Sequence, residues 1–403
     1  MKLHLFNPDT DLALADGKAN YLPPSSVHQM AVDLAALPMW YASPGDGVLA
    51  ASAYNDAFFQ RMKVLFNKKD VFLVTEPEVC EYDNIIPVPW GWNASVRRYL
   101  YQKGIPLTVL PSDDELRRWR MMASREQVTT CLAALSGLPF CCGESVNFYN
   151  IEECQKYVED HRHAVLKAPW SGSGRGLLWC KRGYTKVVAG WCSNTLRHQG
   201  CVVAAPVYDK VEDFAMEFQS DGHGNIRFIG YSLFRTNARG AYRGNILLSD
   251  YQFEKWMAQY ISIEVLVQIR TAVQDVLARL FASYIGFLGV DMMVCRAEKF
   301  LIHPCVEINL RMNMGVIACQ LHKHLLAPVT TGRFYIEYYA SSEKLNECHM
   351  QDEVAAPLIV KNNRVVSGYL SLVPVTPVSH YRAYIKASPL GMENFHFHND
   401  QSL

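Results

Sequence analysis

The most informative pattern in the chain lies in two stretches, Gly289-Val-Asp-Met-Met-Val294 and, shortly afterwards, Val306-Glu-Ile-Asn-Leu-Arg311. Both are apolar runs interrupted by acids, which is typical of largely buried β-strands. Two adjacent antiparallel strands would place Asp291 beside Glu307 and Asn309. Because side chains alternate between the two faces of a strand, Glu307 and Asn309 would share one face. The sequence therefore predicts a hairpin with two carboxylates and an amide on one side.

These residues have the chemistry of a metal site. Carboxylate and amide oxygens are the ligands that Mg²⁺ prefers, and nucleotide phosphates commonly complete its shell. We predict Asp291, Glu307 and Asn309 as metal ligands, with Mn²⁺ as an alternative to Mg²⁺. Arg311, on the same face, can hold a phosphate or a carboxylate with two bonds. A half-exposed hairpin with a solvated polar face is the alternative, but burying both acids without a cation would oppose like charges.

A second segment, Val165-Leu-Lys-Ala-Pro-Trp-Ser-Gly-Ser-Gly-Arg-Gly176, begins as a strand and becomes a glycine-rich loop. Small residues let a backbone approach phosphates, which successive N–H groups can then bind. Lys167 would reach the same phosphates. Leu177 breaks the G-x-G-x-x-G pattern, and the Gly-Lys-Ser/Thr of a P-loop is missing, so the loop alone could be a turn. Combined with Asp291 and Glu307, which we call the metal pair, the loop predicts phosphate binding by Ser171, Gly172, Ser173, Gly174 and Gly176.

Length and composition limit the classes of protein. A chain of 403 residues exceeds a single core, so two or three packed subdomains are expected. Lys plus Arg and Asp plus Glu number 39 each, so no net field would attract nucleic acid or an anionic membrane, and we expect neither as a partner. The apolar runs are too short to span a bilayer. Twelve cysteines without a C-x-x-C pair indicate reduced thiols in a cytoplasmic protein.

Short apolar runs alternate with helix-like stretches in the first part of the chain, which predicts a parallel sheet with crossover helices. The predicted strands there are 2–6, 47–53, 71–75, 85–89 and 106–109, and the helices are 55–66 and 95–103. Acidic residues after Pro111 and the stretch Ser124-Arg-Glu-Gln127 predict two helix starts. Further strands are predicted at 165–168, 176–180, 201–205, 214–219 and 227–234, with a long helix at 263–285. Near the end, 356–361 and 364–372 predict a hairpin turning at Asn362-Asn363.

In this order, the features resemble the ATP-grasp superfamily over roughly residues 120–330. The resemblance rests on the strand lysine, the glycine loop, the acid pair with Glu-x-Asn-x-Arg, and a helix that ends in Gly137-Leu-Pro139. It implies an α/β (α+β) ATP-grasp fold preceded by a Rossmann-like, pre-ATP-grasp α/β domain. The implied domains are 1–118, an ATP-grasp domain 119–335 of two subdomains with ATP between them, and a C-terminal extension 336–403. The motifs cover neither the first domain nor the extension.

The resemblance also implies the cofactors, ATP and Mg²⁺, and the residues that bind the nucleotide. Arg125 stands where the family commonly has a lysine near the phosphates. The strand from Cys201 to Val207 is similar to the adenine-binding hinge, although no acid opens it. Asp209 would reach the ribose, and either Asp213 or Glu217 would face the pocket. The implied nucleotide-binding residues beyond the loop are Arg125, Lys167, Ala204, Ala205, Val207, Asp209 and Asp213.

Three arginines at four-residue spacing suggest the substrate side. Arg235, Arg239 and Arg243 could bind a carboxylate or its acyl phosphate, the alternative being a basic surface. The polar loop Asn7-Pro-Asp-Thr-Asp11 follows the first strand, and loops at the carboxyl ends of parallel strands commonly contact ligands. We predict Arg311, Arg243 and Arg235 as the catalytic arginines.

The activity that the resemblance implies is a two-step ligase reaction. A carboxylate takes the γ-phosphate of ATP to give an acyl phosphate and ADP, and an amine, or less often a thiol, then displaces phosphate. The expected partners are thus a small-molecule carboxylate and an amine, and the sequence is also compatible with a homodimer. The alternatives are a small-molecule kinase on the same fold and a nucleotide-binding protein without catalysis.

Overall fold

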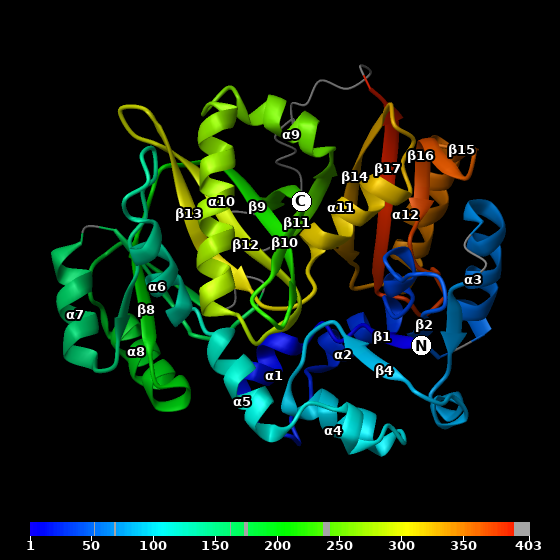
Figure 1. The fold of residues 1–403 in the computed structure, drawn as a ribbon, viewed down its shortest axis with the longest axis horizontal. Helices are drawn as coiled ribbons and strands as arrows, with labels where there is room; N and C mark the ends of the chain where they lie inside the picture. The colour runs from blue at the N-terminus through cyan, green and yellow to red at the C-terminus, as the bar shows by residue number, and fades with distance from the viewer. Residues whose placement is uncertain (52, 68–69, 162, 173–175, 237–241, 391–403) are drawn as a thin grey trace.

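A computed structural model of the protein describes residues 1–51, 53–67, 70–161, 163–172, 176–236 and 242–390. In these ranges the strands form three sheets, two of four strands and one of nine (Figure 1). The first small sheet comes from the N-terminal residues, the second from the middle of the chain, and the large sheet from the middle and the end.

The N-terminal sheet is parallel, as the alternating pattern predicts. Its strands lie in the order β3-β2-β1-β4, with β1 pairing in parallel with both β2 and β4. They are β1 (Lys2–Leu5), β2 (Gly47–Leu49), β3 (Phe72–Val74) and β4 (Ile86–Pro89). The α-helices of this part are α1 (Thr10–Asp16), α2 (Ser25–Asp33), α3 (Ala53–Phe66) and α4 (Ala94–Gln102). Short 3₁₀ helices occupy η1 (Leu37–Trp40), η2 (Pro77–Glu81) and η3 (Leu107–Val109).

One predicted strand is wrong, because residues 107–109 form the 3₁₀ helix η3 rather than a fifth strand. Leu107 and Val109 are about half exposed, so their apolar character does not reflect burial in a sheet. The next two helix starts are confirmed, in α5 (Asp113–Met122) and α6 (Glu126–Leu135). At α5, Ser112 and Glu115 form a capping box, each side chain bonding the other's backbone N–H.

The second small sheet forms a separate lobe, at the left of Figure 1 with α7 and α8. Its strands are antiparallel, in the order β5-β8-β6-β7. The elements are β5 (Val146–Phe148), α7 (Ile151–Asp160), β6 (Ala164–Lys167), β7 (Leu177–Cys180), α8 (Lys186–Gln199) and β8 (Val202–Pro206). The two helices and the sheet enclose their own apolar core. We call this unit the small lobe.

The large sheet has the order β13-β12-β9-β10-β11-β14-β17-β16-β15. Its strands are β9 (Lys210–Asp221), β10 (Ile226–Thr236), β11 (Tyr242–Leu247), β12 (Ile285–Arg296), β13 (Phe300–Asn309), β14 (Thr330–Tyr338), β15 (Ile359–Lys361), β16 (Arg364–Ser371) and β17 (Tyr381–Pro389). The helices are α9 (Asp250–Met257), α10 (Ile263–Leu280), α11 (Met314–His324) and α12 (Ser342–Ala355).

Two details of this sheet bear on the sequence predictions. The long helix α10 ends at Leu280, five residues before the predicted end at 285. The prediction ran too far because Phe281 and Tyr284, just after the helix, are also buried and so continue its apolar pattern. The hairpin between β15 and β16 is confirmed, and both Asn362 and Asn363 have positive φ, at 51° and 59°. The boundary expected between residues 335 and 336 falls inside β14, and β15 to β17 continue the same sheet.

Two apolar clusters connect the parts of the molecule. One packs α6, α9 and α10 on β9, β10, β12 and β13. The other joins the N-terminal domain to the end of the chain, with Phe6 and Trp40 in the same cluster as Leu372. The indole Nε1 of Trp40 donates to the Leu372 carbonyl at 2.6 Å. The N-terminal domain is thus packed firmly against the large sheet.

Among the helices in the described ranges, none combines the length and apolar character needed to cross a membrane.

Candidate nucleotide and metal site

The paired strands β12 and β13 bring the predicted metal ligands together. Asp291 lies directly opposite Glu307 in the antiparallel register, and Asn309 lies opposite Gly289, two pairs along. Asn309 Nδ2 donates to Asp291 Oδ2 at 3.1 Å. All three oxygen-bearing side chains are therefore on one face of the hairpin, as the alternation of side chains requires.

The electrostatics of this pair favour a cation. Burial, together with the nearby charge of Glu307, raises the pKa of Asp291 to about 7. A divalent ion would relieve this conflict. No cluster of three or more His, Cys, Asp or Glu side chains suited to a metal occurs in the part of the chain that the structure describes. Two carboxylates and an amide fit an ion that takes its remaining ligands from water and nucleotide oxygens, as Mg²⁺ does.

Arg125, at the N-terminus of α6, links the metal pair to the glycine loop. Its side chain is 5% exposed, and its Nη2 donates to Glu307 Oε1 at 2.7 Å. It also donates to the carbonyls of Ala168, at 2.8 Å, and Ser171, at 2.9 Å. Its buried Nε has no hydrogen-bond partner among the described residues. The arginine thus lies between the acid pair and the start of the glycine loop, with one N–H that has no partner among the described residues.

Lys167 ends β6 in the small lobe and points across to the large sheet. Its Nζ donates to the Val306 carbonyl at 3.3 Å. Burial, with the neighbouring charge of Arg125, lowers the pKa of Lys167 to about 8, although the charge of Glu307 opposes the shift. Two basic side chains therefore lie beside the acid pair, between the two sheets.

At two described positions of the glycine loop, close neighbours leave no room for a side chain. A Cβ on Gly176 would lie 2.1 Å from Ser171 Oγ, and a Cβ on Gly172 would lie 2.8 Å from Asp11 Oδ2. The Gly176 carbonyl accepts from the Ala168 N–H at 2.9 Å, which closes the base of the loop. Ser173 and Gly174, also predicted to bind phosphate, lie outside the described residues.

The predicted adenine strand is β8. Ala204 and Ala205 are buried in it and pair with the neighbouring strand β6. Val207 is 41% exposed and begins the connection to β9, and the Asp209 carbonyl accepts from the Arg296 N–H at 2.8 Å. This connection therefore runs beside the end of β12, between the small lobe and the large sheet.

Two acids on β9 face the same side as the metal pair. Asp213 is paired in register with Met293, and its Oδ2 accepts from Lys210 Nζ at 2.5 Å and from Thr236 Oγ1 at 2.8 Å. Glu217 is 1% exposed and is paired with Gly289.

The Glu217 carboxylate is buried against the start of α11. Its Oε2 accepts from Asn313 Nδ2 at 2.9 Å, and a Cβ on Gly315 would lie 1.9 Å from its Oε1. Burial raises the pKa of Glu217 to about 8, and the charge of Asp291 adds to the rise. Asp213 is therefore the more accessible of the two acids, and Glu217 is buried against Asn313.

The structure shows contacts or exposure for two of the three predicted substrate arginines, but no arrangement that identifies a substrate site. Arg235 forms an ion pair with the buried Glu212, and Arg243 is exposed on β11. Arg239 lies outside the described residues. Arg235 and Arg243 remain predictions as substrate contacts.

Arg311 has a partner that sequence reasoning did not assign. Its Nε and Nη2 donate to the two oxygens of Asp11, at 2.9 and 2.7 Å. Asp11 lies in the first turn of α1, after the β1 strand. Its position in a polar loop at the carboxyl end of a parallel strand was the available signal.

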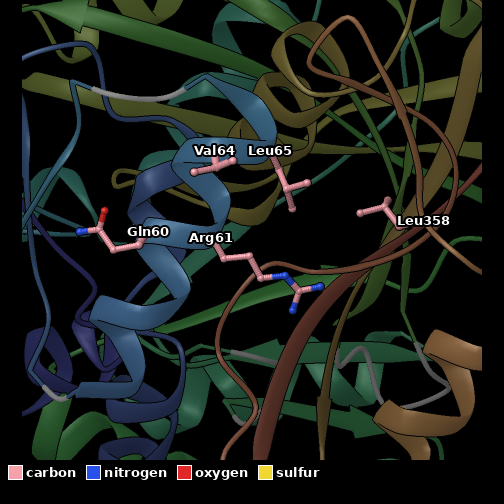
Figure 2. A pocket seen from close by; sticks show the side chains of 5 residues that line it. All are labelled: Gln60, Arg61, Val64, Leu65 and Leu358. Atoms are coloured by element: carbon pink, nitrogen blue, oxygen red, sulfur yellow. The ribbon is translucent and has the colours of Figure 1, made fainter.

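An open cleft of about 620 Å³ lies elsewhere, between α3 and the residue before β15 (Figure 2). Gln60, Arg61, Val64 and Leu65 line it on the helix side, and Leu358 faces them. None of these positions carries a predicted site residue, so the cleft is separate from the metal pair.

Comparison with solved structures identifies the fold. The protein is similar to a biotin carboxylase–β,γ-ATP complex from Campylobacter jejuni, with a TM-score of 0.53 and 11% identity over 96% of this chain and 87% of the other. It also resembles carboxyaminoimidazole ribonucleotide synthase from Aspergillus clavatus, complexed with ATP (TM-score 0.49, 10% identity, 87% and 95% coverage). A third similar structure is N5-carboxyaminoimidazole ribonucleotide synthetase from Thermus thermophilus (TM-score 0.49, 13% identity, 96% and 93% coverage).

No protein-family model matches the sequence, and no curated protein matches it either. The likeness to the biotin carboxylase over nearly the whole chain confirms the predicted ATP-grasp fold with its N-terminal α/β domain.

Proposed function

We propose that the protein is an ADP-forming ligase that uses Mg·ATP to activate a carboxylate as an acyl phosphate, which an amine then attacks. One observation supports it most directly: Asp291 faces Glu307 and bonds Asn309 on the large sheet, with Lys167 and Arg125 reaching the same place. The fold is shared with a biotin carboxylase whose structure is a β,γ-ATP complex.

The roles follow from the chemistry of each group. Asp291, Glu307 and Asn309 would hold Mg²⁺, which neutralises phosphate charge and helps to orient the transferred group. Lys167 and Arg125 place positive charge where the phosphates would lie, and the unpartnered Arg125 Nε can donate to a phosphate oxygen.

The remaining proposals concern partners, location and domains. The substrates are a small-molecule carboxylate and an amine, and we place the reaction in the cytoplasm. All twelve cysteines are free thiols, which supports a reducing compartment. For the domains, we propose residues 1–118 as the N-terminal domain and 119–335 as the nucleotide-binding domain. Within the extension 336–403, the described strands β15 to β17 continue the large sheet, which β14 enters across the 335/336 boundary.

The test measures ADP release while pairs of carboxylates and amines are screened with Mg²⁺ and ATP. ADP formed only when both an acid and an amine are present supports the ligase. A phosphorylated product without an amine identifies a kinase, and tight nucleotide binding without turnover identifies a binding protein.

Substitutions at the metal pair complete the test. Asp291→Asn and Glu307→Gln should each lower the Mg²⁺-dependent affinity for ADP by at least about tenfold, because each removes a charged ligand. The matched control is Glu298→Gln, which changes an exposed acid in the turn between β12 and β13. The proposal fails if the wild-type protein binds no nucleotide, or if both variants bind Mg·ADP as the control does.

A further inference from the structure

A carboxylate from the N-terminal domain reaches into the proposed nucleotide site. The two oxygens of Asp11 accept side-on from Arg311, at 2.9 Å from Nε and 2.7 Å from Nη2. The side chains are 23% and 17% exposed, respectively. Two parallel charge-assisted bonds in this partly shielded place define the plane of the guanidinium, which a single surface contact would not do.

The same guanidinium continues to the metal ligands. Arg311 Nη2 also donates to Asn309 Oδ1 at 2.9 Å, and Asn309 Nδ2 donates to Asp291 Oδ2 at 3.1 Å. A side-chain amide has a donor end and an acceptor end, and these two bonds together select one orientation. Asp11 is therefore the first member of a chain of four side chains that ends on a predicted metal acid.

The backbone that carries Asp11 is held in place from several sides. Thr10 Oγ1 donates to the Asn7 carbonyl at 2.9 Å, and Asn7 Nδ2 donates to the Gly91 carbonyl at 2.9 Å. The Met312 N–H, next to Arg311, donates to the Trp90 carbonyl at 2.8 Å. The loops after β1 and β4 thus meet the end of the β12–β13 hairpin, so that hydrogen bonds connect the segments that carry Asp11 and Arg311.

The glycine loop passes beside the same carboxylate. A Cβ on Gly172 would lie 2.8 Å from Asp11 Oδ2, so the absence of a side chain there leaves room for the acid. An acid in the first turn of a helix is favoured by the helix dipole even without a partner. That effect alone, however, does not account for the fork with a residue 300 positions away in the sequence.

We propose that Asp11 is a positioning residue of the nucleotide site: by holding Arg311, it orients Asn309 for the metal ion that accompanies the nucleotide. This inference rests on the proposed function of the site in binding Mg·ATP. Asp11 acts through Arg311 and does not itself touch the reacting groups. Binding of the metal–nucleotide complex thereby depends on a residue of the N-terminal domain.

The test compares the affinity for ADP with and without Mg²⁺, measured by isothermal titration calorimetry. Asp11→Asn keeps the shape of the side chain but removes its charge and one of its two acceptor oxygens. Its Mg·ADP affinity should fall about tenfold, while its affinity for ADP without metal changes less than about threefold. Asp11→Glu, which restores the charge, should recover at least part of the loss. Asp16→Asn, at the other end of α1 and partly exposed, is the matched control and should bind as the wild-type protein does.

A second comparison separates positioning from a general structural effect. In the background of Arg311→Met, the further change Asp11→Asn should cause no additional loss of Mg·ADP affinity, since the residue through which Asp11 acts is gone. The inference is overturned if Asp11→Asn binds Mg·ADP like the control, if it weakens ADP binding equally with and without metal, or if its effect persists without Arg311. If the wild-type protein binds no Mg·ADP, the proposed function falls together with this inference; wild-type binding with an unaffected Asp11→Asn overturns only the inference.

Discussion

Arg125 Nη2 donates to Glu307 Oε1 at 2.7 Å, so a buried arginine forms an ion pair with a carboxylate that we predict to bind the metal. The two residues are 182 positions apart: Arg125 immediately precedes α6, and Glu307 lies in β13. Without a metal ion, the guanidinium supplies the positive charge that the acid pair needs. A metal ion at Glu307 would therefore compete with Arg125 for this carboxylate, while both would attract the phosphates of a nucleotide.

If they compete, removing the arginine should change the affinities for ADP and for Mg²⁺ in opposite directions. Arg125→Met should lower the affinity for ADP at least about tenfold, because a charge-assisted donor to phosphate is lost. The same change should raise the affinity for Mg²⁺ alone, since Glu307 is released. Calorimetry with ADP and with Mg²⁺ measures both. Arg118→Met, at an exposed position on α5, is the control, and a weaker Mg²⁺ affinity in the Arg125 variant would contradict competition.

Lys167 predicts a dependence of nucleotide binding on pH. With its pKa lowered to about 8, the lysine is charged below that pH and neutral above it. ADP affinity should therefore fall as the pH rises from 7 to 9.5, with the midpoint above 8 because bound phosphate favours the charged form. Lys167→Arg, which stays charged, should show a smaller decline. Equal declines in both proteins would show that another group titrates.

Glu217 predicts a dependence of stability on pH. Its pKa is raised to about 8 in the folded protein, while in the unfolded chain it returns to about 4.5. Between these values the folded state binds more protons, so the contribution of this acid to stability decreases as the pH rises from 4.5 to 8. Glu217→Gln does not titrate and can still accept from Asn313.

Urea unfolding of the two proteins at several pH values measures the effect. The free energy of unfolding of Glu217→Gln should exceed that of the wild type by an amount that grows across this window, to on the order of 5 kcal/mol. A difference that stays constant between pH 5 and pH 8 would show that Glu217 is not buried in this way.

We expect a methyl group added at Gly91, where the N-terminal domain contacts the segment after β13, to lower the free energy of unfolding. A Cβ there would lie 2.4 Å from Thr10 Cγ2 and 3.1 Å from Arg311 Cβ. Gly91→Ala should reduce the free energy of unfolding by about 1–3 kcal/mol, because the neighbours must move. Gly190→Ala, on the exposed face of α8 with nothing within 4 Å, should instead stabilise by up to about 1 kcal/mol. Thermal unfolding compares them, and an equally stable Gly91→Ala would mean that the contact is loose.

Local signals in the sequence predicted the features that depend on neighbouring residues. The predicted helix start after Pro111, where the structure shows a capping box of Ser112 and Glu115, and the Asn362-Asn363 turn each depend on residues within a few positions. The facing of Asp291 and Glu307 also follows from a short antiparallel connection, in which strand alternation decides which side chains meet. The predicted strand at 106–109 failed because apolar residues there are exposed, which local pattern alone does not reveal.

Patterns in continuous stretches of sequence thus predicted the hairpin that pairs Asp291 with Glu307, the strand that leads into the glycine loop and the alternating N-terminal domain, since periodicity within one stretch encodes each of them. The tertiary structure was needed to show that Arg125 bonds Glu307 and that Asp11 bonds Arg311, because each contact joins distant segments whose approach depends on how the domains pack. It also decided that Glu217 is buried while Asp213 bonds Lys210, a difference that two acids on the same strand face do not show in sequence. Side chains gain partners from the elements packed over them, and that packing is a property of the whole fold.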